Sequence, residues 1–213
     1  MTHPSQFAWD SEYRQKGQLF AGVTPGIPVF SPGERVLEVG CGDGKTLASM
    51  VARAAPVPQP SIVGMDISTA ALTLCRKRFS RANTLQLVHA DAARMPFPDG
   101  SFDWVLLIHV LDHFLTDGRE RVAREAARVV HARGRVLVRT FSCSDFRAGR
   151  GEEIEEGTFL RGSGIFTHYF TGEEVRELFS HLRVVSLEEV SWKIRVMGET
   201  VTRAEIHAVF QEE

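Results

Sequence analysis

Residues 35–46, RVLEVGCGDGKT, decide the fold of this chain. The short apolar run Arg35–Val39, which ends in glycines, predicts a buried β-strand. Gly40, Gly42 and Gly44 then predict a tight turn that leads directly into a helix. In doubly wound α/β folds, a ligand binds where the carboxyl end of a strand meets the first turn of such a helix. The stretch therefore predicts an α/β fold with a binding site at its glycine turn.

The spacing of the glycines separates three kinds of ligand. The dinucleotide fingerprint needs glycines at its first, third and sixth positions, and the sixth position from Gly40 is Lys45. The phosphate-binding loop of nucleotide hydrolases ends in Gly-Lys-Thr, as here, but Val39 stands where its opening glycine belongs. The carboxylates of Glu38 and Asp43 would also repel a polyphosphate. The turn therefore favours a ligand with a cationic centre and sugar hydroxyls.

The alternation of strands and helices continues outward from this turn. Further strands are predicted at Ser61–Met65, Leu85–Val88, Phe102–Ile108, Gly134–Thr140, Leu182–Val190 and Val201–Phe210. Helices are predicted from Gly44 to Arg53, from an N-cap at Ser68 to about Phe79, from Gly118 to His131, and from an N-cap at Thr171 to Phe179. This order predicts an α/β fold with a doubly wound, mostly parallel, seven-stranded Rossmann-like sheet. An antiparallel edge strand is expected near Val201–Phe210.

The length of 213 residues suits one domain, because single cores commonly reach this size. Residues 35–140 are predicted to form the ligand-binding core and residues 171–213 a helix and the edge strands. Residues 1–30 are expected to cover the core from the N-terminal side. Residues 141–170 are rich in Gly, Ser and charge and are too long for a structureless connector, so they are predicted to form a lid.

The composition, 43% hydrophobic and 24% charged, is that of an ordinary globular protein. The formal net charge of −2 does not favour a dedicated nucleic-acid binder, which carries a basic surplus. The apolar runs are far shorter than the roughly 20 residues that cross a bilayer, so no membrane partner is expected. The three cysteines form neither a disulfide framework nor a zinc pattern. These features predict a soluble cytoplasmic protein.

The stretch Val36–Gly44 resembles the first motif of the class I S-adenosylmethionine-dependent methyltransferases of type 11. Asp66 ends the second predicted strand, where the family carries a carboxylate for both ribose hydroxyls. Asp91 and Ala92 follow the third, where a family Asp accepts a hydrogen bond from the adenine amino group. Residues 95–103, MPFPDGSFD, resemble another stretch common in the family. The resemblance covers residues 35–140.

The regions outside this core are similar, more loosely, to thiopurine and tellurite methyltransferase relatives. Trp9-Asp10-x-x-Tyr13 resembles an N-terminal element that lies over the cofactor in such relatives, and residues 168–171, HYFT, precede a similar helix. The resemblance implies S-adenosyl-L-methionine as the cofactor. The residues that it and the turn assign to cofactor binding are Tyr13, Glu38, Gly40, Cys41, Gly42, Asp66, Ile67, Asp91, Ala92 and Ile108.

Methyl transfer is an in-line displacement that needs alignment and, for a protonated acceptor, a base. His113 is the first candidate for that base, because many family members carry a histidine near the reacting centre in the matching segment. His109 lies four residues earlier, on the same face if the segment is helical, and Tyr169 is a third candidate. A structural role stays open for each histidine. The His109/His113 spacing also suits a metal, but no third ligand stands at a matching spacing, and no metal is expected.

The predicted function is methyl transfer to a small-molecule acceptor. Three alternatives stay open: a protein or tRNA methyltransferase, a non-catalytic S-adenosylmethionine-binding protein, and a nucleotide hydrolase acting through Gly44-Lys45-Thr46. The acidic run Glu152–Glu156 is either a solvated loop or a contact for a cationic acceptor. The many aromatic residues of the predicted lid suit either an apolar acceptor pocket or packing onto the sheet.

Overall fold

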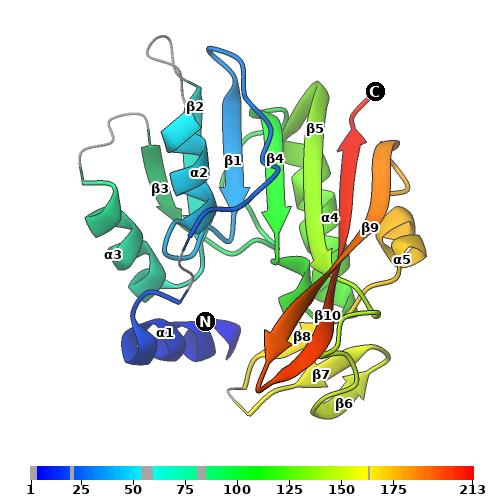
Figure 1. The fold of residues 1–213 in the computed structure, drawn as a ribbon. Coiled ribbons are helices and arrows are strands. Elements are labelled where there is room, and N and C mark those ends of the chain that lie inside the picture. Colours follow the sequence, from blue (N-terminus) through cyan, green and yellow to red (C-terminus); the bar gives the residue numbers. More distant parts are fainter. Residues whose placement is uncertain (1–3, 20–21, 54–59, 81–84, 163) are drawn as a thin grey trace.

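A seven-stranded sheet with the strand order β3-β2-β1-β4-β5-β10-β9 forms the centre of the molecule (Figure 1). The structure is a computed structural model that describes residues 4–19, 22–53, 60–80, 85–162 and 164–213. The strands of this sheet are β1 (Arg35–Val39), β2 (Ser61–Asp66), β3 (Leu85–His89), β4 (Phe102–Ile108), β5 (Val130–Phe141), β9 (Arg183–Val196) and β10 (Glu199–Gln211). The helices are α1 (Pro4–Lys16), α2 (Lys45–Arg53), α3 (Thr69–Arg78), the 3₁₀ helix η1 (Leu111–His113), α4 (Thr116–Val129) and α5 (Gly172–Leu178).

The predicted fold class is confirmed. Strands β3, β2, β1, β4 and β5 are parallel, whereas β10 runs antiparallel to both β5 and β9. The expected antiparallel strand is therefore β10, and β9 lies outside it at the edge of the sheet. Since β1 pairs with β2 on one side and with β4 on the other, the order in which strands are added to the sheet reverses between β1 and β4. Open α/β sheets bind their ligands at such a point, beyond the carboxyl ends of the strands.

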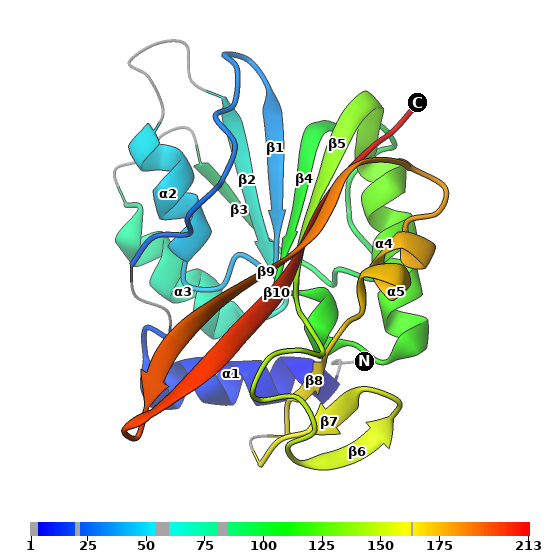
Figure 2. The ribbon, with the colours of Figure 1, turned by 45° about the vertical axis from the view of Figure 1, so that its right-hand side comes forward.

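Apolar side chains alternate along the central strands and divide the core into two layers. On β4, Trp104 and Leu106 pack with α2 and α3, whereas Phe102, Val105 and Leu107 pack with α4 and α5. The figures show these helix pairs on opposite faces of the sheet (Figures 1 and 2). Burial of each side chain of this size contributes about 1.5–3 kcal/mol to the stability of the fold. The two layers hold the carboxyl ends of β1 and β4 in place.

The last two strands form a long ribbon that continues past the rest of the sheet (Figure 2). They pair from Glu199 with Val196 to Gln211 with Arg183 and are longer than the predicted strands. Met197 and Gly198 connect them with φ values of 49° and 89°. Two successive positive φ values are typical of the tight turns that join hairpin strands. The sequence does not reveal this turn, since methionine rarely adopts a positive φ.

The predicted lid, residues 141–170, contains a second sheet. Strands β6 (Glu152–Glu155), β7 (Thr158–Leu160) and β8 (Phe166–His168) pair antiparallel in the order β6-β7-β8. Glu155 fixes this small sheet to the start of α4. Oε2 of Glu155 accepts hydrogen bonds from Thr116 N at 2.9 Å and Thr116 Oγ1 at 3.0 Å. The small sheet lies below the carboxyl ends of the large one, on the same side of the molecule as α1 (Figures 1 and 2).

Helix α1 runs beneath the carboxyl ends of the central strands (Figure 2). Asp10 anchors it to the start of α3, because Asp10 Oδ1 accepts hydrogen bonds from Ser68 Oγ at 2.6 Å and Ala70 N at 3.0 Å. Ser68 is the predicted N-cap, and its Oγ accepts a hydrogen bond from Ala71 N. The predicted N-cap at Thr171 is also present and forms a capping box with Glu174.

No helix in the described segments is long and apolar enough to cross a bilayer.

Replacement of Asp10 by Ala should loosen α1 from the molecule. The variant loses three acceptor contacts at the start of α3, so the free energy of unfolding should fall by about 1–2 kcal/mol. Amide hydrogens of α1 should exchange faster in mass spectrometry. The control is Glu12→Ala, which removes only the surface pair with Lys16 and should change stability by less than about 1 kcal/mol. Equal exchange in the two variants would show that Asp10 does not hold the helix.

Candidate functional site

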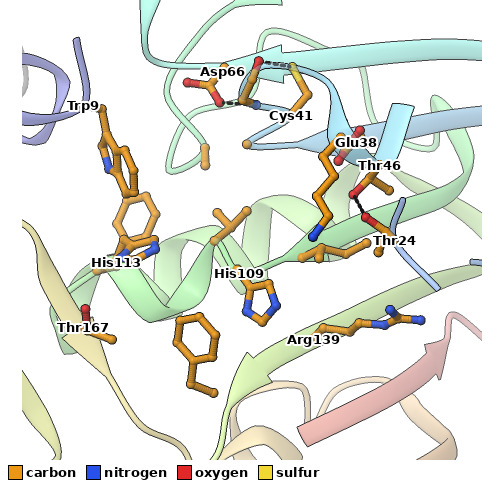
Figure 3. Close-up of a pocket in the computed structure, with 18 of the residues that line it drawn as sticks. Trp9, Thr24, Glu38, Cys41, Thr46, Asp66, His109, His113, Arg139 and Thr167 are labelled. Carbon is orange, nitrogen blue, oxygen red and sulfur yellow. Dashed lines mark hydrogen bonds between the residues drawn. The ribbon is translucent and has the colours of Figure 1, made fainter. Parts of the chain in front are cut away.

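A cavity of about 910 Å³ lies where the carboxyl ends of the central strands face α1, the small sheet and the ribbon (Figure 3). All thirteen residues that the sequence assigns to the site line this cavity, although their roles stay predictions. They are Tyr13, Glu38, Gly40, Cys41, Gly42, Asp66, Ile67, Asp91, Ala92, Ile108, His109, His113 and Tyr169. The fold therefore brings together residues from α1, from three strands and the loops that follow the strands, from η1 and from the segment after β8.

The glycine turn is close-packed, and its backbone needs glycine. Gly40, Gly42 and Gly44 have φ values of 66°, 56° and 87°, which side chains of L-residues rarely tolerate. A Cβ atom on Gly42 would stand 2.5 Å from the hydroxyl oxygen of Tyr13, and one on Gly40 would stand 2.6 Å from Val110 Cγ2. The turn thus leaves its backbone open to a ligand and has no room for a side chain.

Glu38 presents an unpartnered oxygen beneath this turn. The residue is buried, and its Oε2 has no hydrogen-bond partner among the described residues. Burial raises the pKa of this carboxyl, although a hydrogen bond with Thr46 opposes the shift. The hydroxyls of Thr46 and Thr24 are 2.9 Å apart and form a hydrogen bond. Thr46 stands where a phosphate-binding loop has the hydroxyl that binds magnesium, so this hydroxyl already has a protein partner. A ligand ammonium group would satisfy Glu38 and restore its charge.

Asp66 ties the glycine turn to α3. Its Oδ2 accepts a hydrogen bond from Gly42 N at 2.8 Å and its Oδ1 accepts one from Ser68 N at 2.8 Å. Burial raises the pKa of Asp66 despite these bonds. A carboxylate offers about four lone-pair sites, so Asp66 keeps acceptor capacity for a ribose hydroxyl beside its backbone partners. Asp91, just after the next strand, accepts a hydrogen bond from Ala93 N at 2.9 Å and also lines the cavity.

His109 lies between two carboxylates. Its Nδ1 is 3.4 Å from Asp112 Oδ2, and its Nε2 is 3.3 Å from Glu205 Oε1. Burial alone would lower the pKa of His109, but the two carboxylates outweigh it and raise the pKa to about 9. The ring therefore carries a positive charge at neutral pH, and it stacks on Phe141 with 4.3 Å between centroids. This charge argues against the predicted role of His109 as a base.

His113 has the opposite environment. Its Nδ1 is 2.7 Å from the carbonyl oxygen of Phe166, so Nδ1 carries the proton and Nε2 keeps its lone pair. Burial lowers the pKa of His113, and the ring is therefore neutral at pH 7. The indole of Trp9 packs edge-on against it at 4.8 Å (Figure 3). A neutral imidazole with an open nitrogen in a cavity suits a general base.

The condition for a shared helical face, a helix that contains both His109 and His113, is not met. The 3₁₀ helix begins only at Leu111, and His109 precedes it with a φ of 54°. The backbone of His109 is therefore outside any helix, and the ion pairs with Asp112 and Glu205 orient its ring. The two rings nevertheless line the same cavity.

Tyr169 and His168 are neighbours in the chain, but Tyr169 lines the cavity and His168 does not. Tyr169 faces the cavity, its hydroxyl oxygen accepts a hydrogen bond from Arg161, and burial raises its pKa. The phenol is therefore neutral at pH 7 and suits donation of a hydrogen bond better than acceptance of a proton. His168 is buried away from the cavity, with Nδ1 2.7 Å from Thr158 Oγ1. His168 is a structural residue.

Several residues of the cavity were not singled out from the sequence. Arg139 is buried in β5 and donates hydrogen bonds to the carbonyl oxygens of Pro25 at 2.6 Å and Gly26 at 2.8 Å. The sequence offers no specific signal for this role, because Arg135 lies in the same predicted strand and only the fold buries Arg139 beside these carbonyl oxygens. Further lining residues include Trp9, whose motif the sequence did reveal, together with Thr24, Arg147, Arg161, Trp192 and Glu205. No group of three or more His, Cys, Asp or Glu side chains in the described segments could hold a metal ion.

Comparisons with known proteins point to one family. Residues 37–138 match the family described as a methyltransferase domain. A tRNA N(3)-cytidine methyltransferase METTL2 from Gallus gallus is 28% identical over 171 residues, which are 76% of this chain and 46% of that protein. The 27-O-demethylrifamycin SV methyltransferase of Amycolatopsis mediterranei is 29% identical over 189 residues, 86% of this chain and 65% of that protein. The chain thus spans about half to two thirds of the length of these relatives.

The fold is also similar to that of solved proteins. A SAM-dependent methyltransferase from Methanosarcina mazei superposes with a TM-score of 0.72 over 86% of this chain and 94% of that one, at 20% identity. At this identity the likeness concerns the fold alone.

The two histidines should titrate at opposite ends of the neutral range. In NMR, His109 should lose its proton at about pH 9 and His113 below pH 6.5, with assignments from His109→Gln and His113→Gln. Because the pKa of His109 is raised on folding, its contribution to stability is full below pH 6.5 and is lost as the pH rises through about 9. Titration of both rings at ordinary values would contradict the assigned environments.

Proposed function

Because this chain belongs to the class I S-adenosylmethionine-dependent methyltransferases, we propose that it transfers a methyl group to a small-molecule acceptor with His113 as the general base. One arrangement carries the proposal. The cavity joins a glycine turn ringed by carboxylates to a neutral histidine whose Nε2 is open. The first half suits a cationic cofactor with a ribose, and the second half suits a proton acceptor.

The residues around the turn would hold the cofactor. The backbone at Gly40 and Gly42 allows close approach, Asp66 has lone pairs for the ribose hydroxyls, and Glu38 has an unpartnered oxygen for the ammonium group. Asp91 is the corresponding acceptor for the adenine amino group. S-adenosylmethionine supplies a methyl carbon that its sulfonium already makes electrophilic.

The chain itself supplies position and a dry environment. Helix α1 brings Trp9 and the buried Tyr13 to one side of the cavity, and Phe141 and Tyr169 lie on the other. Side chains on both sides would displace water around the bound ligands, and alignment of the reacting atoms provides most of the acceleration in a displacement of this type.

The acceptor's proton would pass to Nε2 of His113. The hydrogen bond from Nδ1 to the carbonyl of Phe166 fixes the tautomer, so Nε2 is the nitrogen with a free lone pair. The lowered pKa keeps the ring neutral at pH 7 before transfer. A base positioned in this way contributes about 10²–10⁴-fold to rate.

The acceptor proposed is a small molecule, for three reasons. The cavity of about 910 Å³ lies within the roughly 300–1,000 Å³ of small-molecule sites. Aromatic side chains line the part away from the glycine turn. The net charge of −2 does not favour binding to a polyanion. The similarity to the rifamycin methyltransferase agrees with this class of acceptor.

A tRNA is the second candidate acceptor, because the METTL2 protein of Gallus gallus aligns with 76% of this chain. Arginine side chains on the lid side of the cavity also agree with a phosphate-bearing partner. The two candidates separate in one assay, in which the purified protein receives labelled S-adenosylmethionine with a small-molecule panel or with total tRNA. Label in tRNA alone would overturn the small-molecule proposal.

Replacement of Gly42 by Ala should weaken cofactor binding. The new methyl group collides with Tyr13 and fills the close approach at the turn, so affinity for S-adenosylhomocysteine should fall at least tenfold. The control is Gly149→Ala, where φ is +76° but no atom lies within 4 Å.

Thermal unfolding gives the readout for both glycine variants. Saturation of the unaltered protein at about 100 times the dissociation constant should add roughly 2.7 kcal/mol, and each kcal/mol raises the midpoint by about 2–4 °C. A rise with ATP and magnesium in place of S-adenosylhomocysteine would contradict the cofactor assignment.

Replacement of His113 by Ala should reduce turnover by about 10²–10⁴-fold while affinity for S-adenosylhomocysteine changes little. The acidic limb of the rate profile, set by the lowered pKa of His113, should disappear in the variant. His131→Ala is the control, since His131 is an exposed histidine remote from the cavity. Unchanged turnover in His113→Ala would exclude the general base.

A further inference from the structure

Charge is divided between the two ends of the cavity. The carboxylates that line the glycine-turn end belong to Glu38, Asp43, Asp66 and Asp91. The guanidinium groups that the predicted lid contributes belong to Arg147 and Arg161. Arg139 of β5 is bonded to the carbonyl oxygens of Pro25 and Gly26, and the carboxylate of Glu205 pairs with His109. S-adenosylmethionine carries one carboxylate beside its ammonium and sulfonium groups, so it accounts for the acidic end and for one cation such as Lys45, but not for the arginines of the predicted lid.

Arg161 has donors without protein partners. One of its terminal nitrogens donates to the hydroxyl oxygen of Tyr169 and, at 3.3 Å, to the carbonyl oxygen of Arg147. Its Nε is buried and has no hydrogen-bond partner among the described residues. A buried, unsatisfied donor on a guanidinium group is costly unless a ligand meets it. Because the Tyr169 oxygen accepts from Arg161, the phenol hydrogen is available to the same ligand.

Arg147 adds a second, fixed guanidinium group. Its Nε lies 2.8 Å from Asp145 Oδ1, and its carbon Cζ lies 4.2 Å from the centre of the Phe141 ring. Asp145 also accepts a hydrogen bond from Arg203 Nε at 2.7 Å. One buried carboxylate thus serves two guanidinium groups, which leaves one positive charge in excess before Arg161 is counted.

Aromatic rings line the space beside these cations. Phe141 stacks between Arg147 and the protonated ring of His109, and Tyr169 lies 6.1 Å from Phe141 between centroids. Trp192 reaches the cavity from the ribbon and is 39% exposed. Rings of this kind favour a flat, apolar ligand body.

The acidic run Glu152–Glu156 does not contribute a charge to this end. None of its residues lines the cavity. Glu155 is bound to Thr116 and Arg119, and Glu153 accepts a hydrogen bond from Gly157 N. The reading of this run as a contact for a cationic acceptor therefore has no support in the geometry.

We propose that the acceptor is a small aromatic molecule with an anionic oxygen group, a carboxylate or a phosphate monoester, which Arg161, Arg147 and the hydroxyl of Tyr169 bind. This inference rests on the proposed methyl transfer and specifies its substrate class. The anion lies at the basic end, and the body of the acceptor extends along the aromatic rings towards His113. The division of charge then orients donor and acceptor before any reaction occurs, because each end of the cavity repels the other's ligand.

The test compares matched ligands that differ in charge. Affinities of 4-hydroxybenzoate, 4-hydroxyphenyl phosphate and neutral 4-hydroxybenzamide are measured by calorimetry or NMR, with and without S-adenosylhomocysteine. At least one anion should bind about tenfold or more tightly than the amide. Arg161→Met and Arg147→Met should each weaken the preferred anion about tenfold to hundredfold and leave the amide unchanged. Arg150→Met is the control, since this residue packs on Phe146 and does not line the cavity.

Two results would overturn the inference. One is equal affinity for the anions and the amide. The other is binding of a short oligoribonucleotide that depends on Arg161 while neither small anion binds, which would assign the arginines to RNA. Binding of S-adenosylhomocysteine by each variant reports on the cofactor end separately. If the unaltered protein did not bind S-adenosylhomocysteine, the proposed function would be contradicted. The preference for anions, measured without the cofactor, would still decide this inference.

Discussion

The carboxylate of Asp66 accepts hydrogen bonds from Gly42 N and Ser68 N, and the rest of the site depends on these two bonds. They hold the glycine turn after β1 against the start of α3. Gly42 and Asp66 are 24 residues apart in the chain. Ser68 in turn donates to Asp10, so the same junction places α1 below the strands. A buried carboxylate that accepts from backbone N–H groups is stable only while both partners stay in place. The junction therefore fixes the cofactor end of the cavity as one rigid unit.

The opposite end has a different origin, which explains how much of the molecule could be predicted. The strand, turn and helix at residues 35–53 and the N-cap at Ser68 follow from local pattern, and the structure agrees with them. The sequence of the small sheet β6–β8 has no clear hydrophobic period. Its short strands are instead fixed by contacts with residues distant in the chain, such as that of Glu155 with Thr116. The roles of Arg147 and Arg161 depend on Asp145 and Tyr169, whose proximity only the folded chain defines. Local sequence thus predicted the cofactor end better than the acceptor end.

The two histidines show why residue type alone does not assign chemistry. His109 and His113 are four residues apart and line one cavity, yet their pKa values move in opposite directions. Glu205, from β10, contributes a carboxylate to His109, whereas β8 gives His113 only a carbonyl oxygen. Both partners follow the histidines by more than 50 residues, so no local motif contains this information. Pairs of titrating groups whose environments separate their pKa values are typical of acid–base sites.

The position of β10 also governs when the site can exist. Strand β10 pairs with β5 and with β9, and it carries Glu205 to His109. A nascent chain that has emerged only as far as α5 already contains the glycine turn, Asp66 and both histidines, but His109 lacks its second carboxylate. Pairing of β10 with β5 closes a loop of more than 50 residues, a long-range step that is slow compared with helix formation. The environment of His109 therefore depends on the long-range pairing of β10, whereas the glycine turn is held by contacts among residues 10–68.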